Sequence, residues 1–392
     1  MPRVFPDPYT ELSDFTGHIH EMNYILKVLN GEMTMEEYPI QKEAARDICT
    51  EHGVTEELAV SPWDETQQGD SARAGEPPVL VCETTTEGEE SMKGIITEIE
   101  RFALKDGPGI RTTVFFKGCN MACKWCHNPE TLSVRPQLMI YPDKCIGCGA
   151  CVEACRAGAR TLGKNGALQY DRTACKHCGA CAANCFSGAL VMSGKEMTVE
   201  EVMEEILQDR AYYRNSGGGV TLSGGEVSTQ PEFALELLQA LKKEGISTAI
   251  ETNLHAPWSV YERMLPFLDL VMFDIKIFDE EAHRRWTGVS NRQILENAKK
   301  VAASGKPYLV RTPVIPGVND TEEEIGSIAN YVGTLGGAQY YELLLFNPLG
   351  ESKYDALQMD NTFAGTRPTG EEGAARLKWV AAQTPGLSVR VG

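Results

Sequence analysis

The chain has 392 residues, 13 cysteines and a net charge of −18, and this length suffices for two or three domains with a full-sized core. No apolar run is long enough to span a bilayer, and no signal-peptide pattern opens the chain. The 55 acidic and 37 basic residues argue against the basic surface of a nucleic-acid binder. We therefore expect neither a membrane nor a nucleic acid as partner.

The acidic charge is concentrated at the start of the chain. Residues 1–91 hold 20 Asp and Glu against 5 Lys and Arg, a net of −15, whereas residues 92–392 hold 35 against 32, a net of −3. Two stretches of the acidic segment, 18–33 and 39–53, have helical periodicity. We expect an acidic N-terminal extension that is either a small helical module or a non-native or disordered leader before a natural start at Met92.

From Met92 onward, short apolar runs alternate with helical patterns. Six runs are predicted to be strands: 111–117, 219–224, 247–252, 268–276, 307–315 and 340–346. Helix starts and stops are indicated by two capping-box spacings and two C-terminal glycines: Thr198 with Glu201, Thr321 with Glu324, Gly245 and Gly305. This α/β alternation predicts a parallel sheet with right-handed crossovers, either open or curled into a partial barrel.

The first crossover contains roughly sixty residues of cysteine-rich sequence, too long for an ordinary loop. We expect an inserted domain at 137–193, within a barrel formed by 92–136 and 194–392. Two runs, CIGCGACVEAC and CKHCGACAANC, have the spacing of bacterial two-cluster ferredoxins, in which the fourth cysteine of each run ligates the other cluster. That rule predicts one 4Fe–4S cluster on Cys145, Cys148, Cys151 and Cys185, and a second on Cys155, Cys175, Cys178 and Cys181. Structural zinc is the alternative, but it would leave four thiolates unused.

A third cysteine group directly follows the first predicted strand. The stretch GCNMACKWCHNPE contains Cys119, Cys123 and Cys126. Three thiolates would hold three irons of a 4Fe–4S cluster and leave the fourth open, as a catalytic metal site requires. The alternative is a surface loop with a redox-active thiol pair. Such close spacing favours metal ligation in a reducing, cytosolic compartment over disulfides, and the isolated Cys49 and Cys82 are read as ordinary thiols.

Polar residues and glycines follow the other predicted strands. In parallel α/β barrels the working residues lie at the carboxyl ends of the strands. Each of these residues alone could belong to a turn or an internal ion pair, but together they surround the cysteine loop. The candidates are Gly224, Gly225, Glu226, Glu251, Thr252, Asn253, Asp274, Lys276, Arg311 and Asn347.

From Met92 to about residue 355, the sequence resembles the glycyl-radical-enzyme activating enzymes of the radical S-adenosylmethionine (SAM) superfamily, relatives of the pyruvate formate-lyase activating enzyme. The resemblance rests on the cysteine loop with the preceding DGPGIRTTVFFK, and on TLSGGEVSTQPEF, DIKIFDEEAH, TGVSN, RTPVIPGVND and NPLGESKY. The ferredoxin-like insert further resembles the branch whose partners are dehydratases, decarboxylases, carbon–nitrogen or carbon–sulfur lyases and fumarate-adding synthases.

This resemblance implies a partial (β/α)6 radical SAM barrel, three 4Fe–4S clusters and SAM as cofactors. The implied activity is an oxidoreductase reaction that reductively cleaves SAM and removes a hydrogen atom from a backbone glycine of a partner glycyl radical enzyme. Reduced flavodoxin or ferredoxin is the implied electron donor. The insert clusters would relay an electron to the cluster on Cys119, Cys123 and Cys126.

The resemblance also implies roles for single residues. Trp125, Cys126 and His127 would border the adenine; Gly224 to Glu226 would border the methionyl amine; Thr252 would also contact SAM. Asp274, Ile275 and Lys276 would lie at the ribose and carboxylate, with Lys276 counted as catalytic, and Arg311 would pair with a SAM carboxylate. Two residues depart from the family pattern. Glu251 stands where Asp is common, which bears on a monovalent cation near SAM, and Asn347 stands where His is common, at a ribose contact.

Two other functions share parts of these motifs. A radical SAM enzyme that modifies another peptide or a small molecule would share the cysteine loop and the SAM motifs, and only DGPGIRTT and the insert argue against it. A non-catalytic polyferredoxin electron carrier would share the cysteines but would have no need of SGGE and DIK. The identity of the partner enzyme cannot be predicted from these motifs.

Overall fold

The computed structural model of the protein describes residues 91–164 and 168–392. The described residues belong to one compact unit, Ser91–Gly392. Apart from Ser91, the predicted N-terminal extension, with Cys49 and Cys82, therefore lies outside the described residues. Within the described ranges, no helix is both long and apolar enough to cross a bilayer.

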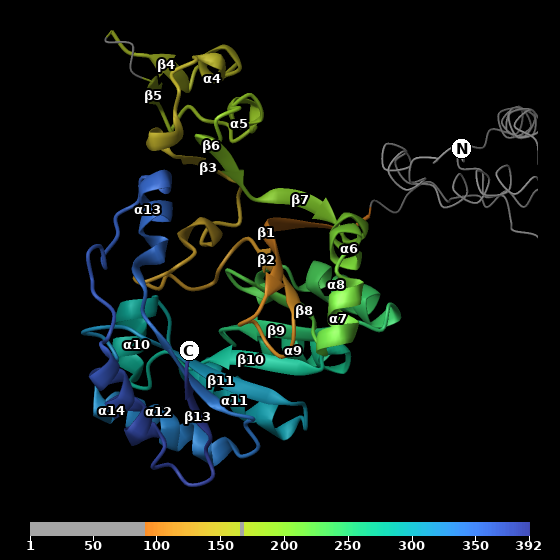
Figure 1. Ribbon diagram of the computed structural model, residues 1–392, viewed down its shortest axis with the longest axis vertical. Helices are drawn as coiled ribbons and strands as arrows, with labels where there is room; N and C mark the ends of the chain where they lie inside the picture. Colours follow the sequence, from red (N-terminus) through yellow and green to blue (C-terminus); the bar gives the residue numbers. More distant parts are fainter. Residues whose placement is uncertain (1–90, 165–167) are drawn as a thin grey trace, which may run out of the picture. The chain divides into compact units, whose positions relative to one another are not determined.

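A nine-stranded sheet organises the described part of the chain (Figure 1). Its strand order is β13-β12-β11-β10-β9-β8-β2-β1-β7, parallel from β13 to β2 and antiparallel at β1 and β7. The strands are β1 (Lys93–Ala103), β2 (Arg111–Phe116), β7 (Lys195–Thr198), β8 (Gly219–Gly224), β9 (Ser247–Thr252), β10 (Leu270–Asp274), β11 (Tyr308–Val314), β12 (Tyr341–Leu345) and β13 (Val389–Val391). The six predicted strands are thus confirmed as β2 and β8 to β12, neighbours in one parallel sheet.

Helices follow most of these strands, as the sequence pattern predicts. They are α6 (Val199–Leu207), α7 (Arg210–Ser216), α8 (Pro231–Lys243), α9 (Trp258–Met264), α10 (Glu280–Thr287), α11 (Arg292–Ala303), α12 (Glu322–Leu335), α13 (Glu351–Leu357) and α14 (Glu371–Ala381). Short 3₁₀ turns are η2 (Pro129–Thr131), η3 (Pro142–Lys144), η4 (Val227–Thr229), η5 (Leu265–Phe267) and η6 (Pro348–Gly350). Fully buried side chains such as Leu238, Val301 and Ile328 join these helices to the sheet in one apolar core.

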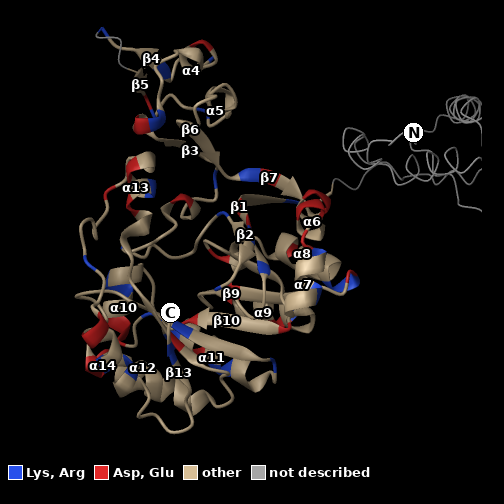
Figure 2. Ribbon diagram, viewed as in Figure 1, with Lys and Arg blue, Asp and Glu red and all other residues tan. Residues whose placement is uncertain are grey.

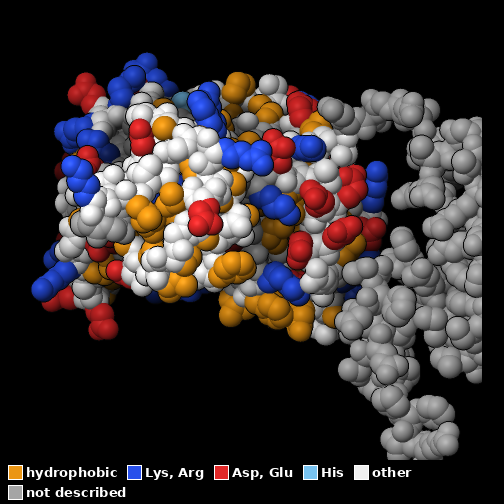
Figure 3. All heavy atoms as spheres, turned by 90° about the horizontal axis from the view of Figure 1, so that it is seen from above, with side chains coloured by type: hydrophobic (Ala, Val, Ile, Leu, Met, Phe, Trp, Pro, Cys, Tyr) orange, Lys and Arg blue, Asp and Glu red, His pale blue; other side chains and the backbone are white. Residues whose placement is uncertain are grey.

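The predicted helix caps are present, with one difference. Thr198 and Glu201 form the reciprocal capping box of α6, whereas at α12 the Thr321 hydroxyl accepts from the Glu324 N–H and the Glu324 carboxylate instead accepts from the Phe278 N–H. Acidic side chains in the first turns of both helices complement the helix dipole (Figure 2). On the face shown in Figure 3, basic, acidic and apolar side chains are interspersed, in keeping with the nearly balanced charge of residues 92–392.

The crossover from β2 to β8 contains two small antiparallel sheets and two short helices. β3 (Gln137–Ile140) pairs with β6 (Leu190–Ser193), and β4 (Arg160–Leu162) pairs with β5 (Leu168–Tyr170). The short helices α4 (Ala150–Glu153) and α5 (Ala180–Ala183) each follow a glycine in the left-handed conformation, Gly149 and Gly179 at φ 75°. Leu138, Cys151, Cys181 and Leu190 form a small core of their own.

Candidate functional site

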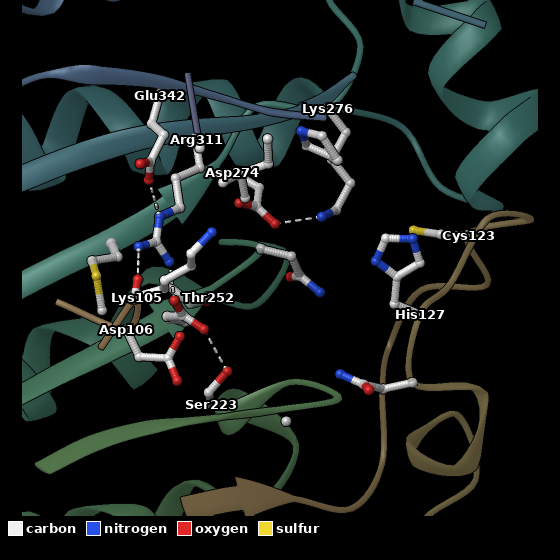
Figure 4. Close-up of a pocket in the computed structure, with 18 of the residues that line it drawn as sticks. Lys105, Asp106, Cys123, His127, Ser223, Thr252, Asp274, Lys276, Arg311 and Glu342 are labelled. Carbon is white, nitrogen blue, oxygen red and sulfur yellow. Dashed lines mark hydrogen bonds and ion pairs between the residues drawn. The ribbon is translucent and has the colours of Figure 1, made fainter. Parts of the chain in front are cut away.

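A cavity of about 960 Å³ lies where the parallel strands end and the cysteine loop begins (Figure 4). Its lining comes from the loop after β2 and from the carboxyl ends of β8, β9, β10, β11 and β12. Among its lining residues are sequence-predicted ones that are up to 228 positions apart, from Cys119 to Asn347. The sequence-predicted residues at its wall are Cys119, Cys123, Trp125, Cys126, His127, Gly224, Gly225, Glu226, Glu251, Thr252, Asn253, Asp274, Lys276, Arg311 and Asn347.

Backbone hydrogen bonds hold the cysteine loop in place. The N–H groups of Ala122 and Lys124 donate to the carbonyls of Thr287 and Trp286 at 2.8 and 3.0 Å, which ties the loop to the end of α10. The Cys126 N–H donates to the Cys123 carbonyl at 3.1 Å and closes a tight turn. The three thiols are therefore presented by a fixed loop and not by a free surface segment.

The three cysteines of this loop are half-buried at the wall of the cavity. Burial raises the pKa of Cys119 and of Cys126 to about 12 and also raises the pKa of Cys123, and neighbouring thiols add to the rise at Cys119 and Cys126. Binding of a metal centre must therefore displace these protons, because thiolates and not thiols are the ligands. In the described ranges no three His, Cys, Asp or Glu side chains are placed to hold one metal ion. Thiolates on separate irons of a cluster lie further apart than ligands of one ion, so this finding concerns mononuclear sites.

Trp125 and His127 form an aromatic wall of the cavity. Trp125 is buried and meets Phe363 edge-on at 6.4 Å between ring centroids, and His127 lies 5.5 Å from Phe346. Burial lowers the pKa of His127, so its imidazole is neutral at pH 7. Its Nε2 atom is buried and has no hydrogen-bond partner among the described residues. A buried, unpartnered nitrogen at a cavity wall fits a polar ligand such as an adenine ring.

Gly224 and Gly225 permit two backbone segments to approach closely. Gly224 has φ +117°, and a Cβ added there would meet the Phe116 backbone nitrogen at 2.2 Å. A Cβ on Gly225 would meet the Gly118 carbonyl oxygen at 2.2 Å. These glycines therefore let the end of β8 touch the start of the cysteine loop, which positions the loop against the cavity.

Glu226 is buried, with 2% of its surface exposed. One carboxylate oxygen accepts from the Asn253 N–H at 2.7 Å, and the other accepts from the Thr252 hydroxyl at 2.8 Å and the Ser228 N–H at 3.1 Å. Burial raises the pKa of Glu226, although the hydrogen bonds from these three donors act to lower it. The carboxylate therefore joins the ends of β8 and β9, a structural role that the sequence motif does not indicate.

Asp274 and Lys276 form an ion pair inside the cavity, with 2.5 Å between Lys276 Nζ and Asp274 Oδ2. Their side chains are 28% and 13% exposed, so the pair is not an ordinary surface pair. Burial alone would lower the pKa of Lys276, but the charge of the Asp274 carboxylate and its hydrogen bond to Lys276 raise it. The Ile275 side chain is buried in the core, away from the cavity lining, so only its backbone could meet a ligand.

Arg311 belongs to a charge network that the sequence motifs do not reveal (Figure 4). Its guanidinium forms ion pairs with Glu251 and with Glu342, the latter at 2.9 Å, and donates to the Lys105 carbonyl at 2.6 Å. The Ser223 hydroxyl donates to Glu251 at 2.7 Å. Glu342, Lys105 and Ser223 were missed. A single Glu within the apolar strand YELLL was the available signal for Glu342.

The insert has a second cavity, of about 410 Å³. Four cysteines line it: Cys145, Cys148, Cys151 and Cys185. Three come from the first cysteine run and the fourth from the second run, which is the combination expected for one cluster of a two-cluster ferredoxin. Cys145 and Cys148 are exposed and Cys151 is buried.

Comparisons with known proteins match the same regions. A Radical SAM superfamily profile matches residues 172–329, a 4Fe-4S dicluster domain profile matches 144–189, and a 4Fe-4S single cluster domain profile matches 105–150. The single cluster match includes the cysteine loop, and the dicluster match includes all eight cysteines of the insert.

Two curated relatives align along most of their length. The chain is 45% identical over 274 residues to the (2S)-3-sulfopropanediol dehydratase activating enzyme of Klebsiella oxytoca, covering 68% of this chain and 86% of that protein. It is 42% identical over 306 residues to the benzylsuccinate synthase activating enzyme of Thauera aromatica, covering 76% and 92%. A crystal structure of a domain of pyruvate-formate lyase-activating enzyme from Bacteroides vulgatus ATCC 8482 is 28% identical, covers 45% of this chain and 99% of that chain, and has a TM-score of 0.39. The predicted resemblance is confirmed, and the chain belongs to the radical SAM activating enzymes of glycyl radical enzymes.

Proposed function

We propose that this chain activates a partner glycyl radical enzyme by reductive cleavage of SAM and abstraction of a hydrogen atom from a backbone glycine. The observation that carries the proposal is the convergence of three half-buried cysteines with five strand ends on one cavity. An electron carrier would need the cysteines but not a cavity of about 960 Å³ with this polar wall.

We propose three 4Fe–4S clusters. Cys119, Cys123 and Cys126 would hold the catalytic one, which supplies the electron that cleaves SAM. The shared 410 Å³ cavity supports the first insert set, Cys145, Cys148, Cys151 and Cys185. The remaining set is Cys155, Cys175, Cys178 and Cys181.

Within the main cavity, each candidate residue has a chemical reason to face SAM. Trp125 and His127 offer an apolar wall and an unpartnered nitrogen to the adenine. Glu226 accepts three hydrogen bonds, so one of about four carboxylate acceptor sites remains for the methionyl amine. Asp274 and Lys276 offer an acceptor and a donor to the ribose and the carboxylate.

Arg311 and Asn347 complete the wall of the cavity. Arg311 lines the cavity and, beyond its three partners Glu251, Glu342 and Lys105, keeps N–H groups that would be available to a SAM carboxylate. The Asn347 side chain accepts from the Leu349 N–H at 3.2 Å and leaves its amide N–H₂ for a ribose contact. A monovalent cation near SAM would use Glu251 or Asp274, and each already has a cationic partner, Arg311 or Lys276.

The partner, by the same proposal, is a glycyl radical enzyme, and the electron donor is reduced flavodoxin or ferredoxin acting in the cytoplasm. The relatives named above carry the names of a dehydratase and a synthase activating enzyme, which supports a partner other than pyruvate formate-lyase. We further propose the domain division already given, with the six strands β2 and β8–β12 as a partial (β/α)6 barrel around the cavity and 137–193 as the insert.

The test is iron content together with SAM cleavage. Anaerobically reconstituted protein should hold about twelve irons, three clusters of four, and the variant with Cys119, Cys123 and Cys126 all changed to Ala should hold about eight and produce no 5′-deoxyadenosine. The control changes Cys49 and Cys82 to Ala and should keep both iron and activity. Continued 5′-deoxyadenosine production by the triple variant would refute the assignment of the catalytic cluster.

A further inference from the structure

Arg160, the first residue of β4 in the insert, is a buried arginine with 5% of its surface exposed. Its Nη2 atom donates to Cys151 Sγ at 3.9 Å, and its Nε atom has no hydrogen-bond partner among the described residues. No ion pair of residues 91–164 and 168–392 includes it. A buried guanidinium without a carboxylate is costly, so a negative group is expected at this place.

The two-stranded sheet holds Arg160 against the cysteine cavity. Arg160 stands directly opposite Tyr170 in the β4–β5 pair, and its Cζ lies 5.4 Å from the centroid of the Tyr170 ring, within cation–π range. Both side chains line the 410 Å³ cavity with Cys145, Cys148 and Cys185. The guanidinium is therefore held in the wall of this cavity beside Cys151 Sγ and is not exposed to solvent.

An internal comparison shows that this charge is not a general feature of the cysteine run. CRAGAR, residues 155–160, corresponds to CFSGAL, residues 185–190, so Leu190 occupies the position of Arg160 in the second repeat. Leu190 is also buried, at 5%, and stands opposite Ile140 in the β3–β6 pair. One repeat thus has an arginine and a tyrosine where the other has a leucine and an isoleucine.

We propose that Arg160 is the fixed counter-charge of the iron–sulfur site formed by Cys145, Cys148, Cys151 and Cys185, and that it raises the reduction potential of this site above that of the second insert site. The inference rests on the two-cluster function proposed for the insert. Charge and hydrogen bonds to sulfur set the potential of such sites, and a cation favours the state that carries the additional electron.

The reduction involved is a one-electron transfer from a reduced low-potential electron-carrier protein, in which no bond is made or broken and no proton is needed. Arg160 acts on the sulfur ligands through its charge and is a positioning residue, not a catalytic one. Among the cysteine sulfurs of the described residues, the one to which Arg160 donates is Cys151 Sγ, so its effect is expected at the first site.

The experiment uses the full chain with Cys119, Cys123 and Cys126 changed to Ala, so that only the insert sites contribute. Redox titration followed by electron paramagnetic resonance should give two midpoint potentials. Arg160→Leu copies the residue of the second repeat and should lower the higher of the two midpoint potentials by at least about 59 mV. For one electron this shift means that, at a fixed applied potential, the ratio of reduced to oxidised site falls at least tenfold. Arg160→Lys should lower this midpoint potential less than Arg160→Gln, because lysine keeps the positive charge. Arg156→Leu removes an exposed charge five residues from Cys151 and is the matched control.

The outcomes separate the proposal from the function on which it rests. An iron content of about four or less before Arg160 is changed would refute the two-cluster insert itself. With about eight irons present, unchanged potentials in Arg160→Leu, or an equal fall in Arg156→Leu, would overturn the role of Arg160. If Arg160→Leu fails to hold iron, the same redox titration is carried out on Arg160→Gln and Arg160→Lys. Midpoint potentials that are equal in these two variants and in the unchanged protein would overturn the proposal.

Discussion

The change of Glu226 to Gln tests whether the carboxylate of this residue holds the strand ends together. Three donors converge on its two oxygens: the N–H groups of Asn253 and Ser228 and the hydroxyl of Thr252. A glutamine offers one oxygen, so its N–H₂ must face either the Asn253 N–H or the Ser228 N–H. In both orientations one buried backbone donor loses its acceptor.

The expected loss follows from that mismatch. A buried donor without a partner costs about 1–3 kcal/mol, and the relief of a buried charge offsets part of the loss of charge-assisted bonds. We expect the free energy of unfolding to fall by about 1–3 kcal/mol. The matched control is Glu232→Gln, because Glu232 is exposed and, in the part of the chain that the structure describes, forms its ion pair with exposed Arg263. Such exposed pairs contribute at most about 1 kcal/mol.

The assay is anaerobic urea unfolding followed by far-ultraviolet circular dichroism, with SAM affinity measured separately at a temperature where the variant is folded. If the Glu226 carboxylate holds the ends of β8 and β9 together, the stability of Glu226→Gln should be lower whether or not SAM is present. Unfolding free energies equal to those of the unchanged protein, with SAM binding weakened tenfold or more, would refute bracing and leave the carboxylate as a ligand contact alone.

Three further predictions test other parts of the structure. Asp274→Ala or Lys276→Ala should weaken SAM binding or its productive cleavage at least tenfold, since a lost charged contact costs about 1.5–3 kcal/mol. Near-normal 5′-deoxyadenosine production would contradict this prediction. The surface pair Lys242–Asp269 provides control variants. Burial lowers the pKa of Lys117 from 10.5 to about 8. Between these two pH values the unfolded chain holds a proton that the folded chain has lost, so the free energy of unfolding should rise with pH. Lys117→Met should remove this rise, and an equal pH dependence of stability in the variant and the unchanged protein would disprove the prediction. Cys148→Ser combined with Cys178→Ser should leave the SAM-induced spectral change at the catalytic cluster but stop multiple turnover, and loss of that change in folded, iron-containing protein would count against an electron relay.

Local sequence signals located the parallel strands well because each is a short, buried apolar run between helical segments. For β2, β8 and β9 the predicted starts agree with the structure, and the predicted ranges of β10 and β11 are longer than the strands by a few residues. β1 was missed because the pattern KGIITEIERFA mixes apolar and charged residues, and its side chains are largely exposed or half-buried. β13 was missed because three residues carry little periodicity.

The candidate site was predictable as a set of residues but not as a set of contacts. Strand-end positions identified the cavity wall, since all parallel strands end at one edge. Arg311 contacts Glu342, which lies 31 positions away on the next strand, and Lys105, which lies 206 positions away in a loop. No local sequence pattern encodes such distant pairs. Glu226 likewise reads as a ligand contact in SGGE, while its hydrogen bonds reach the next strand.

The contacts indicate that the cavity is prepared for its ligand before the ligand binds. Arg311 is balanced by Glu251 and Glu342, Lys276 by Asp274, and Glu226 by three donors. These paired groups are already desolvated and oriented, so little reorganisation is needed when a charged substrate enters. By contrast, His127 Nε2 is buried without a hydrogen-bond partner among the described residues, and Cys119 Sγ accepts a long hydrogen bond from Asn253 Nδ2 at 3.9 Å; their chemistry suits an adenine ring and an iron–sulfur cluster. In this part of the chain, unmet bonding capacity is therefore the clearest structural sign of where the cofactors bind.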